Sequence, residues 1–291
     1  LLNDPAFLEA IYMASPVLYR ETIRLNQGAI TEPKEKNRIL SSLVKYYQRM
    51  YSRSTPFGLF SGCAVLNWDE QGDQVLIPNG KFRRSTRLDM HYCCALGQSI
   101  AAHPAVQDRL LFYSNNSAYH IGDELRYIEY RYQSGKRVHQ ISSVAWSDYL
   151  EAVLAKAVNG VQLNKLTALL VAQAAVETEE AESFIQDMVD AQVLIPETDP
   201  AITGTDFIRQ LLTVLNRINQ PAHPDISRMI SQVSGLVNSL SEADQRFHNE
   251  AGFYSSFLQA VSELQVEFEE AKLLQVDMFS EPRQNKLSDK Y

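Results

Sequence analysis

The spacing of apolar residues changes along this 291-residue chain, and these changes constrain its fold more than any other feature. In residues 35–52, Ile39, Leu43 and Tyr46 follow one another every three or four positions, the period of an amphipathic helix. From about residue 110 the period falls to two, as half-buried antiparallel strands require. Beyond residue 147 the helical period returns. The pattern predicts an α+β fold with a mixed lobe of helices and antiparallel sheet.

The first part, residues 1–109, is expected to be an N-terminal α+β domain. Helix is predicted over about 4–30 with a break at Ser15-Pro16. A second helix is predicted over about 35–52 and must end before Thr55-Pro56, because a residue that precedes proline disfavours the helical conformation. Thr55-Pro56-Phe57-Gly58 has the composition of a tight turn.

An apolar run and a polar stretch follow this turn. Residues 59–68 are predicted to form a strand, in which Gly62 permits close approach of another backbone. Residues 75–78 are predicted to pair with that strand across a polar turn at 69–73. Helix is expected to resume near Asp89 and to run to about residue 102.

Residues 110–200 are expected to form a subdomain of their own. Four runs with a period of two, LLFYS, SAYHI, ELRYIEYRY and RVHQIS, are separated by turn signals. Three helices and a closing strand at 193–196 follow, and Ser147 and Thr178 are the expected caps of the first and third helices. This order of elements predicts a winged helix-turn-helix.

Residues 201–291 are expected to form a helical C-terminal segment. Helices are predicted over about 205–219, 224–240 and 251–272, and only LLQVDMF at 273–279 has a strand pattern. The chain starts without methionine and ends on a polar run, so we expect it to be a piece of a longer protein.

Composition narrows the classes of function. No stretch approaches ~20 consecutive apolar residues, so no membrane span is expected. The three cysteines form no CxxC pair and no disulfide pattern, which favours a location in the reducing cytoplasm. The net charge of −8 argues against a general affinity for nucleic acid.

Two basic segments stand out from this acidic background. Residues 34–53 carry six Lys and Arg against one Glu, and residues 81–87 carry four Lys and Arg. On a helix, Lys45, Arg49 and Arg53 would lie on one face, because residues four apart are neighbours. Such islands favour a specific site for a polyanion; the alternative is that they are solvated surface faces.

The run Arg49–Gly62, RMYSRSTPFGLFSG, carries a resemblance that goes beyond these patterns. It resembles the signature of class I lantibiotic dehydratases and of their relatives from thiopeptide pathways, in which Arg-x-x-x-Arg-x-Thr-Pro-Phe-Gly precedes a strand. Shorter segments resemble the family in the same order along the chain, namely FLEAIYMASPVLY, RLDMHY, NNSAYHIGDELRYIEY, VLIPETDPAITGTD and LLQVDMF.

The resemblance implies the glutamylation half of a dehydration reaction. The family takes glutamate from glutamyl-tRNA and esterifies Ser and Thr hydroxyls of a ribosomal precursor peptide, and a separate C-terminal domain then eliminates the glutamate. The residues that the resemblance implies for glutamylation are Arg49, Arg53, Thr55, Asp89 and Asp277. It implies no metal and no cofactor besides glutamyl-tRNA as co-substrate. The fragment alone is expected to be inactive.

Phosphates near the acceptor end of tRNA favour arginine, whose planar guanidinium matches phosphate oxygens. The expected tRNA-binding residues are Lys45, Arg49, Arg53, Arg83, Arg84 and Arg87. Thr55, held extended by Pro56, would form a hydrogen bond to the ester or the ribose. Asp89 would orient a hydroxyl or an arginine, or act as general base.

Residues 110–200 acquire a second role through the resemblance. Related dehydratases use a winged-helix domain to bind the leader of the precursor peptide, which adds as a strand to the wing. The acidic third helix, EEAESFIQDMVDAQ, argues against DNA binding. The expected partners are glutamyl-tRNA, the precursor peptide and the missing C-terminal part of the same enzyme; a homodimer stays open.

Simpler interpretations stand beside these. Thr55 would be only a turn residue, and Asp89 only a helix cap. His91 with Cys93 and Cys94 suggests a metal site, but no further ligand lies at a suitable spacing, so packing roles are favoured. The chain as a whole would then be a non-catalytic module that recognises the leader, or a structural fragment.

Overall fold

The structure, a computed structural model, describes residues 2–68, 75–77, 81–133, 136–174, 176–201, 203–280 and 284–287. The chain divides into two compact units, one made of Leu1–Tyr92 with Gln232–Tyr291 and the other of Cys93–Ser231. The α+β class is confirmed, since helices and small, mainly antiparallel sheets occur in both units. The division into domains expected after residues 109 and 200 stays a prediction.

Three helices open the first unit, α1 (Pro5–Ala14), α2 (Pro16–Asn26) and α3 (Pro33–Ser52). The predicted break at Ser15-Pro16 is confirmed: the Ser15 side chain accepts a hydrogen bond from Leu18 N and so caps α2. The apolar faces of the helices meet in one buried cluster, formed by Phe7, Ala10, Ile11, Leu18, Ile30, Ile39, Leu43 and Phe60.

A two-stranded antiparallel ribbon organises the rest of this unit. Strand β3 (Phe82–Leu88) pairs with β9 (Leu274–Ser280), so that Ser85 lies opposite Asp277. The β9 strand was predicted from LLQVDMF and is confirmed. Because side chains alternate across a strand, Arg84 is buried on one face of the ribbon while Arg87 lies half-buried on the other.

The strand predicted over residues 59–68 is wrong for most of its length. Only β1 (Asn67–Trp68) is a strand, and it pairs in parallel with β10 (Gln284–Leu287). The second predicted strand exists as β2 (Val75–Ile77), but it also pairs with β10, which lies between the two. The predicted turn at 69–73 lies outside the described residues. A local pattern cannot reveal a partner strand that comes from the other end of the chain.

Three more helical segments complete the first unit among the described residues. They are the second part of α10 (Pro224–Gln245), α11 (Ala251–Ser262) and the short helix α12 (Glu270–Leu273). The single helix predicted over 251–272 is therefore interrupted. Gln265 has a φ of 55°, a left-handed conformation that a helix cannot contain, and this residue lies in the interruption.

Among the described residues, the second unit contains helices and strands that follow one another along the chain. They are the larger part of α4 (Met90–Ala101), α5 (Pro104–Gln107), β4 (Phe112–Ser114), β5 (Tyr119–Ile121), β6 (Glu124–Gln133), β7 (Lys136–Ala145), α6 (Asp148–Ala157), α7 (Leu163–Ala174), α8 (Thr178–Asp190), β8 (Leu194–Pro196) and α9 (Phe207–Ile218), followed by the start of α10.

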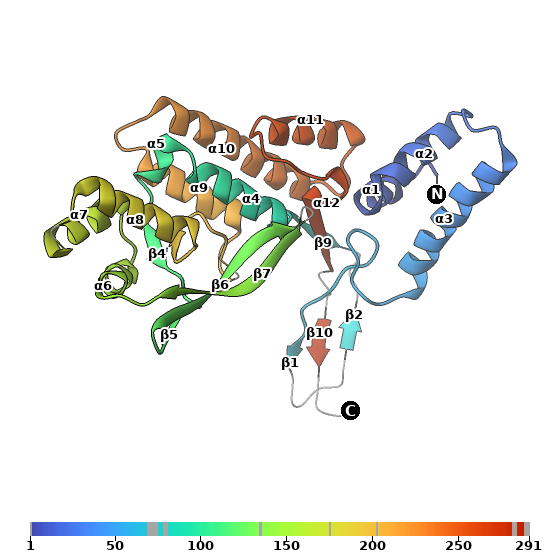
Figure 1. Cartoon of the computed structure of the whole chain (residues 1–291). Coiled ribbons are helices and arrows are strands. Elements are labelled where there is room, and N and C mark those ends of the chain that lie inside the picture. Colours follow the sequence, from blue (N-terminus) through green and yellow to red (C-terminus); the bar gives the residue numbers. More distant parts are fainter. Residues whose placement is uncertain are drawn as a thin grey trace. The chain divides into compact units, whose positions relative to one another are not determined.

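The strands and helices predicted for residues 110–200 are confirmed as elements. Strands β5, β6 and β7 form one antiparallel sheet (Figure 1). Strand β4 pairs with β8. Ser147 caps α6 as predicted, whereas Thr178 is the first residue of α8 and no side chain caps that helix. The winged helix-turn-helix arrangement itself is not shown and stays a prediction.

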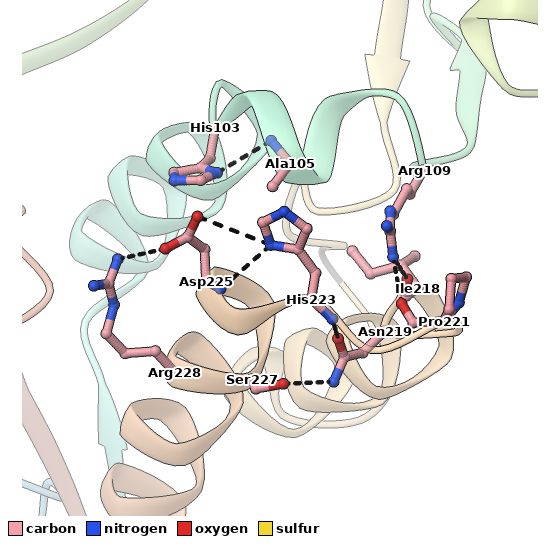
Figure 2. Close-up of polar contacts among 10 residues, drawn as sticks. All are labelled: His103, Ala105, Arg109, Ile218, Asn219, Pro221, His223, Asp225, Ser227 and Arg228. Carbon is pink, nitrogen blue, oxygen red and sulfur yellow. Dashed lines mark hydrogen bonds and ion pairs between the residues drawn. The ribbon is translucent and has the colours of Figure 1, made fainter.

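Hydrogen bonds hold the connection between α9 and α10 in place (Figure 2). Arg109 donates to the carbonyl oxygens of Ile218 (3.0 Å) and Pro221 (2.8 Å). Asn219 accepts from His223 N at 2.7 Å and donates to Ser227 at 3.0 Å. The last turn of α9 and the start of α10 are thereby joined by side chains as well as by the chain itself.

The described residues contain neither a membrane-spanning helix nor a metal-binding cluster. No helix among the described ranges combines the length and the apolar character needed to cross a membrane. In the same ranges, no group of three or more His, Cys, Asp or Glu is arranged to hold a metal ion. Cys93 and Cys94 are buried, and the Cys94 sulfur accepts a hydrogen bond from Arg137.

A buried ion pair joins α1 to the ribbon in the first unit. Arg84 Nη1 lies 2.7 Å from Glu9 Oε1, and the two side chains are only 4% and 1% exposed. The hydroxyl of Tyr254 on α11 donates to the same carboxylate oxygen. Burial, and then the nearby Glu9 carboxylate, raises the pKa of Tyr254, so the hydroxyl stays protonated. Three elements distant in sequence thus share one polar core.

We expect Arg84→Met to destabilise the protein by about 3–5 kcal/mol, because it leaves the Glu9 carboxylate buried without its countercharge. Urea unfolding followed by circular dichroism measures the loss. The matched control is Arg20→Met, which removes an arginine that is 56% exposed from its ion pair with Glu270 and should cost about 0–1 kcal/mol. Equal losses in the two variants would contradict the assignment of Arg84 to the core.

Candidate functional site

The end of the RMYSRSTPFGLFSG run forms a turn that is anchored to β9. Phe57 N donates to Ser61 O at 2.8 Å, so the turn runs from Phe57 to Ser61 and not over Thr55–Gly58 as predicted. Two further backbone bonds join Cys63 to β9, from Cys63 N to Met278 O and from Ser280 N to Cys63 O. The motif is therefore held against a strand more than 200 residues away in the chain.

Gly62 is required for this contact. A Cβ atom at this position would lie 2.6 Å from the Met278 carbonyl oxygen, closer than two such atoms can approach. The predicted close backbone approach at Gly62 is confirmed, although its partner is β9 and not a neighbouring strand of the same hairpin.

The three basic residues at the end of α3 do not form one face. Arg53 follows the helix in an extended conformation (φ −115°, ψ 130°), so it is turned out of the register of Lys45 and Arg49. The guanidinium of Arg49 lies 4.1 Å from the centre of the Phe57 ring, a cation–π contact that joins the helix to the turn. Lys45 and Arg53 are exposed. The expected stack of three cations on one helix face is thus wrong for Arg53.

A pocket of about 250 Å³ lies where α1, the turn and the ribbon meet. Its lining residues are Ala10, Met13, Ala14, Phe57, Gly58, Leu59, Phe60, Arg87, Leu274, Gln275, Val276 and Asp277. Most of these are apolar, and the charged ones are Arg87 and Asp277. The pocket brings one residue of the expected tRNA-binding set together with one of the expected catalytic set.

Arg87 and Asp277 form an ion pair at this pocket. Arg87 Nη1 lies 2.5 Å from Asp277 Oδ2, and each side chain is 43% exposed. Since residues 85 and 277 are opposite each other in the ribbon, the two charged side chains project from the same face on neighbouring strands. Their proximity depends on pairing between strands that are 190 residues apart.

Asp89 lies between β3 and α4 and is held by two donors. Its Oδ1 accepts from His91 N at 2.9 Å, and its Oδ2 accepts from the Gln275 side chain at 2.7 Å. The first contact is that of a residue that begins a helix, so the interpretation of Asp89 as a helix cap is confirmed. The second connects Asp89 to the pocket, because Gln275 is part of the pocket lining. A catalytic role for Asp89 stays a prediction.

The other expected site residues lie away from this pocket. Arg84 is buried in the ion pair with Glu9, so the expectation that it contacts tRNA is wrong. Arg83 is exposed, and its guanidinium lies 5.5 Å from the centre of the Phe279 ring. Thr55 is exposed and is not part of the pocket lining.

Sequence reasoning missed Gln275 and Phe57. Gln275 has a signal that could have found it: in a strand, residues two apart share a face, so LLQVD places Gln275 beside Asp277. Phe57 stood inside the quoted motif as a turn residue. Its contact with Arg49 depends on where the turn folds back, which the motif alone does not specify.

Comparison with known proteins gives a consistent result. The sequence profile of the family described as "Lantibiotic dehydratase, N terminus" matches residues 3–290. The chain is similar to the nisin biosynthesis protein NisB of Lactococcus lactis subsp. lactis, with 32% identity over 123 residues, which are 42% of this chain and 12% of NisB. It is also similar to the subtilin biosynthesis protein SpaB of Bacillus subtilis, with 23% identity over 274 residues, 92% of this chain and 26% of SpaB. The chain spans about a quarter or less of these relatives' lengths.

Two solved structures share the fold. The tRNA-dependent lantibiotic dehydratase MibB from Microbispora sp. 107891 has a TM-score of 0.77 at 19% identity, over 99% of this chain and 28% of MibB. The glutamylation domain of TbtB from thiomuracin biosynthesis, bound to 5'-phosphodesmethylglutamycin, has a TM-score of 0.62 at 15% identity, over 95% of this chain and 32% of that chain.

We expect Gly62→Ala to destabilise the first unit by roughly 1–3 kcal/mol, the usual cost of inserting a methyl group into a packed contact. Gly235→Ala, in the exposed middle of α10 where nothing lies within 4 Å of the added Cβ, should instead stabilise by about 0.5–1 kcal/mol. Chemical unfolding of both variants provides the comparison. A neutral Gly62→Ala would show that the turn is not anchored on β9.

Proposed function

The chain belongs to the family of lantibiotic dehydratase N-terminal regions, and on that premise we propose that it forms the glutamylating part of such an enzyme. In this reaction glutamate passes from glutamyl-tRNA to Ser and Thr hydroxyls of a ribosomal precursor peptide. The observation that carries the proposal is the pocket, which is bounded by the PFGLF turn of the family motif and contains Arg87 and Asp277. Glutamyl-tRNA is the co-substrate.

The chemistry is the exchange of one ester for another. The peptide hydroxyl oxygen forms a bond to the glutamyl carbonyl carbon, the bond to the tRNA ribose oxygen breaks, and the hydroxyl proton ends on that ribose oxygen. The nucleophile belongs to the peptide, so the protein has to position the two substrates and to assist one proton transfer. Asp89 is suited to orient the hydroxyl, because two donors hold its carboxylate while each oxygen keeps a further lone pair.

Exposed cations of the first unit would hold the tRNA. Lys45, Arg53 and Arg83 are exposed, and in our proposal they contact phosphates of the acceptor end. Arg49 has an additional role in this proposal. Its stacking on Phe57 positions the turn that bounds the pocket, in addition to any phosphate contact. Thr55, exposed in the same segment, would hydrogen-bond the ribose or the ester.

We expect Arg49→Ala and Arg53→Ala in the full-length protein to lower glutamate transfer roughly tenfold or more, since a lost charge-assisted hydrogen bond costs about 1.5–3 kcal/mol. The measurement is transfer of radiolabelled glutamate from glutamyl-tRNA to the precursor peptide. Arg53→Ala should also reduce the salt dependence of tRNA binding by about one unit of slope. The control, Arg228→Ala, removes a cation paired with Asp225 in the second unit. Unchanged transfer in both motif variants would refute the proposal.

The second unit favours a further role, recognition of the leader peptide. In the sheet of β5, β6 and β7, side chains cover the part of the β6 edge that the short strand β5 does not reach. There the Ser117 hydroxyl accepts a hydrogen bond from Ile128 N, and the Gln192 side chain accepts one from Tyr130 N. In the part of the chain that the structure describes, β7 pairs only with β6, so its outer edge can receive another strand. We therefore propose that a leader peptide adds to β7.

Exposed apolar side chains accompany this open edge, on a sheet face that also carries the Arg126–Glu124 ion pair. Ile128 and Ile141 lie directly opposite each other on β6 and β7 and are 48% and 69% exposed. Tyr119 and Ile121 of β5 are each 50% exposed and share that face by register. A peptide that adds to β7 would present alternate side chains to this face, and apolar side chains there would cover exposed apolar surface.

We expect a fluorescent synthetic leader peptide to bind the full-length protein saturably, and Ile141→Asp to weaken binding roughly tenfold or more, because a charge would face the apolar leader side chains. Val158→Asp, at an exposed apolar position of the second unit outside this sheet, is the matched control and should leave the affinity unchanged. Fluorescence anisotropy reports both. Failure of the wild-type protein to bind any leader would remove this role.

A further inference from the structure

We infer that the Arg87–Asp277 ion pair recognises the amino acid of the aminoacyl-tRNA, with Arg87 binding the side-chain carboxylate and Asp277 binding the α-ammonium. The inference rests on the proposed function, in which a glutamyl group enters this pocket. It gives Arg87 a different task from the phosphate contact that its sequence neighbourhood predicts. Both residues then select which acyl group is transferred.

The pocket suits an amino acid better than a nucleotide. Its volume of about 250 Å³ is below the ~300–1,000 Å³ of pockets that bind drug-sized ligands. Met13, Phe57 and Leu59 supply apolar walls, which would lie against the methylene groups of a glutamyl side chain. Arg87 and Asp277 are the charged groups of the lining, one of each sign.

The two charged side chains keep unused capacity. Only Nη1 of Arg87 has a partner among the described residues, which leaves the other N–H groups of its fork to donate to a second carboxylate. Only Oδ2 of Asp277 is engaged there, so Oδ1 can accept from an ammonium. A ligand can therefore bind both residues before it separates them.

The Arg87–Asp277 ion pair is exposed enough to exchange partners. Each of its side chains is 43% exposed, and pairs this exposed contribute little to stability. The other arginine–carboxylate pair of the same ribbon, Arg84–Glu9, is almost completely buried and cannot open without leaving a charge in the core. On one face of the ribbon the ion pair is thus structural, and on the other it is available to a ligand.

The two charges of a glutamyl ester are complementary to those of Arg87 and Asp277. It carries a carboxylate at the end of its side chain and an ammonium at its α-carbon, so its binding would replace one ion pair by two. A glutaminyl group lacks the side-chain charge, and an N-acetylated glutamyl group lacks the ammonium. Each would leave one protein charge without a new partner, which is the usual basis of strong discrimination.

The test uses stable amide analogues of the acceptor end, in which 3'-amino-3'-deoxyadenosine 5'-phosphate carries a glutamyl, glutaminyl or N-acetylglutamyl group. Their dissociation constants for the full-length protein are measured by titration calorimetry. We expect the wild-type protein to bind the glutamyl analogue at least tenfold more tightly than either of the other two. We expect Arg87→Gln to lose the preference over glutaminyl alone, and Asp277→Asn to lose the preference over N-acetylglutamyl alone.

Controls separate recognition from folding and from the proposed function. Arg87→Lys and Asp277→Glu keep the charges and should retain a reduced preference, and Arg20→Gln, in an exposed ion pair outside the pocket, should bind as the wild-type protein does. If Arg87→Gln weakens all three analogues by the same factor, Arg87 contacts the phosphate or supports the fold, and the inference is wrong. If the wild-type protein transfers glutamate yet does not distinguish the analogues, the inference fails while the proposed function stands.

Discussion

The pairing of β3 with β9 is the interaction on which the candidate site depends. Seven residue pairs join the two strands in register, and they place Arg87 beside Asp277 although 190 residues separate the two in sequence. The same pairing brings Gln275 to Asp89, and the backbone bonds of Cys63 attach the motif turn to the outer part of β9. Without this ribbon the turn at Phe57–Phe60, Arg87 and Asp277 would not line a common pocket.

The two faces of the ribbon show how environment assigns different tasks to the same residue types. Arg84 faces inward and, with Glu9 and Tyr254, joins α1 and α11 to β3 in a network that water does not reach. Arg87 faces outward, where water weakens its attraction to Asp277 and leaves both side chains open to other partners. The face of the ribbon on which an arginine lies therefore decides whether it stabilises the fold or is available for binding.

In the second unit the important feature is the outer edge of strand β7. The backbone of β6 beyond the short strand β5 is satisfied by Ser117 and Gln192, whereas β7 has no such cover in the described ranges. The unpaired backbone groups of such an edge can bind another extended chain. Proteins usually protect strand edges that have no binding function. The exposed apolar side chains of Ile128 and Ile141 beside it give the edge a preferred kind of partner.

Local structure and family membership could both be predicted from the amino-acid sequence. Local interactions determine the starts of α1 at Pro5 and of α2 at Pro16, the Ser147 cap of α6, and the end of α3 before Thr55-Pro56. They also determine the alternating strands of 110–145, so a local pattern suffices to predict these elements. The burial of Arg84, the exit of Arg53 from the helix and the pairing of β1 with β10 could not be predicted in this way. The same holds for the placement of Gln275 and Arg87 at the pocket. These outcomes depend on contacts between segments far apart in the chain, whose free energy no local pattern contains.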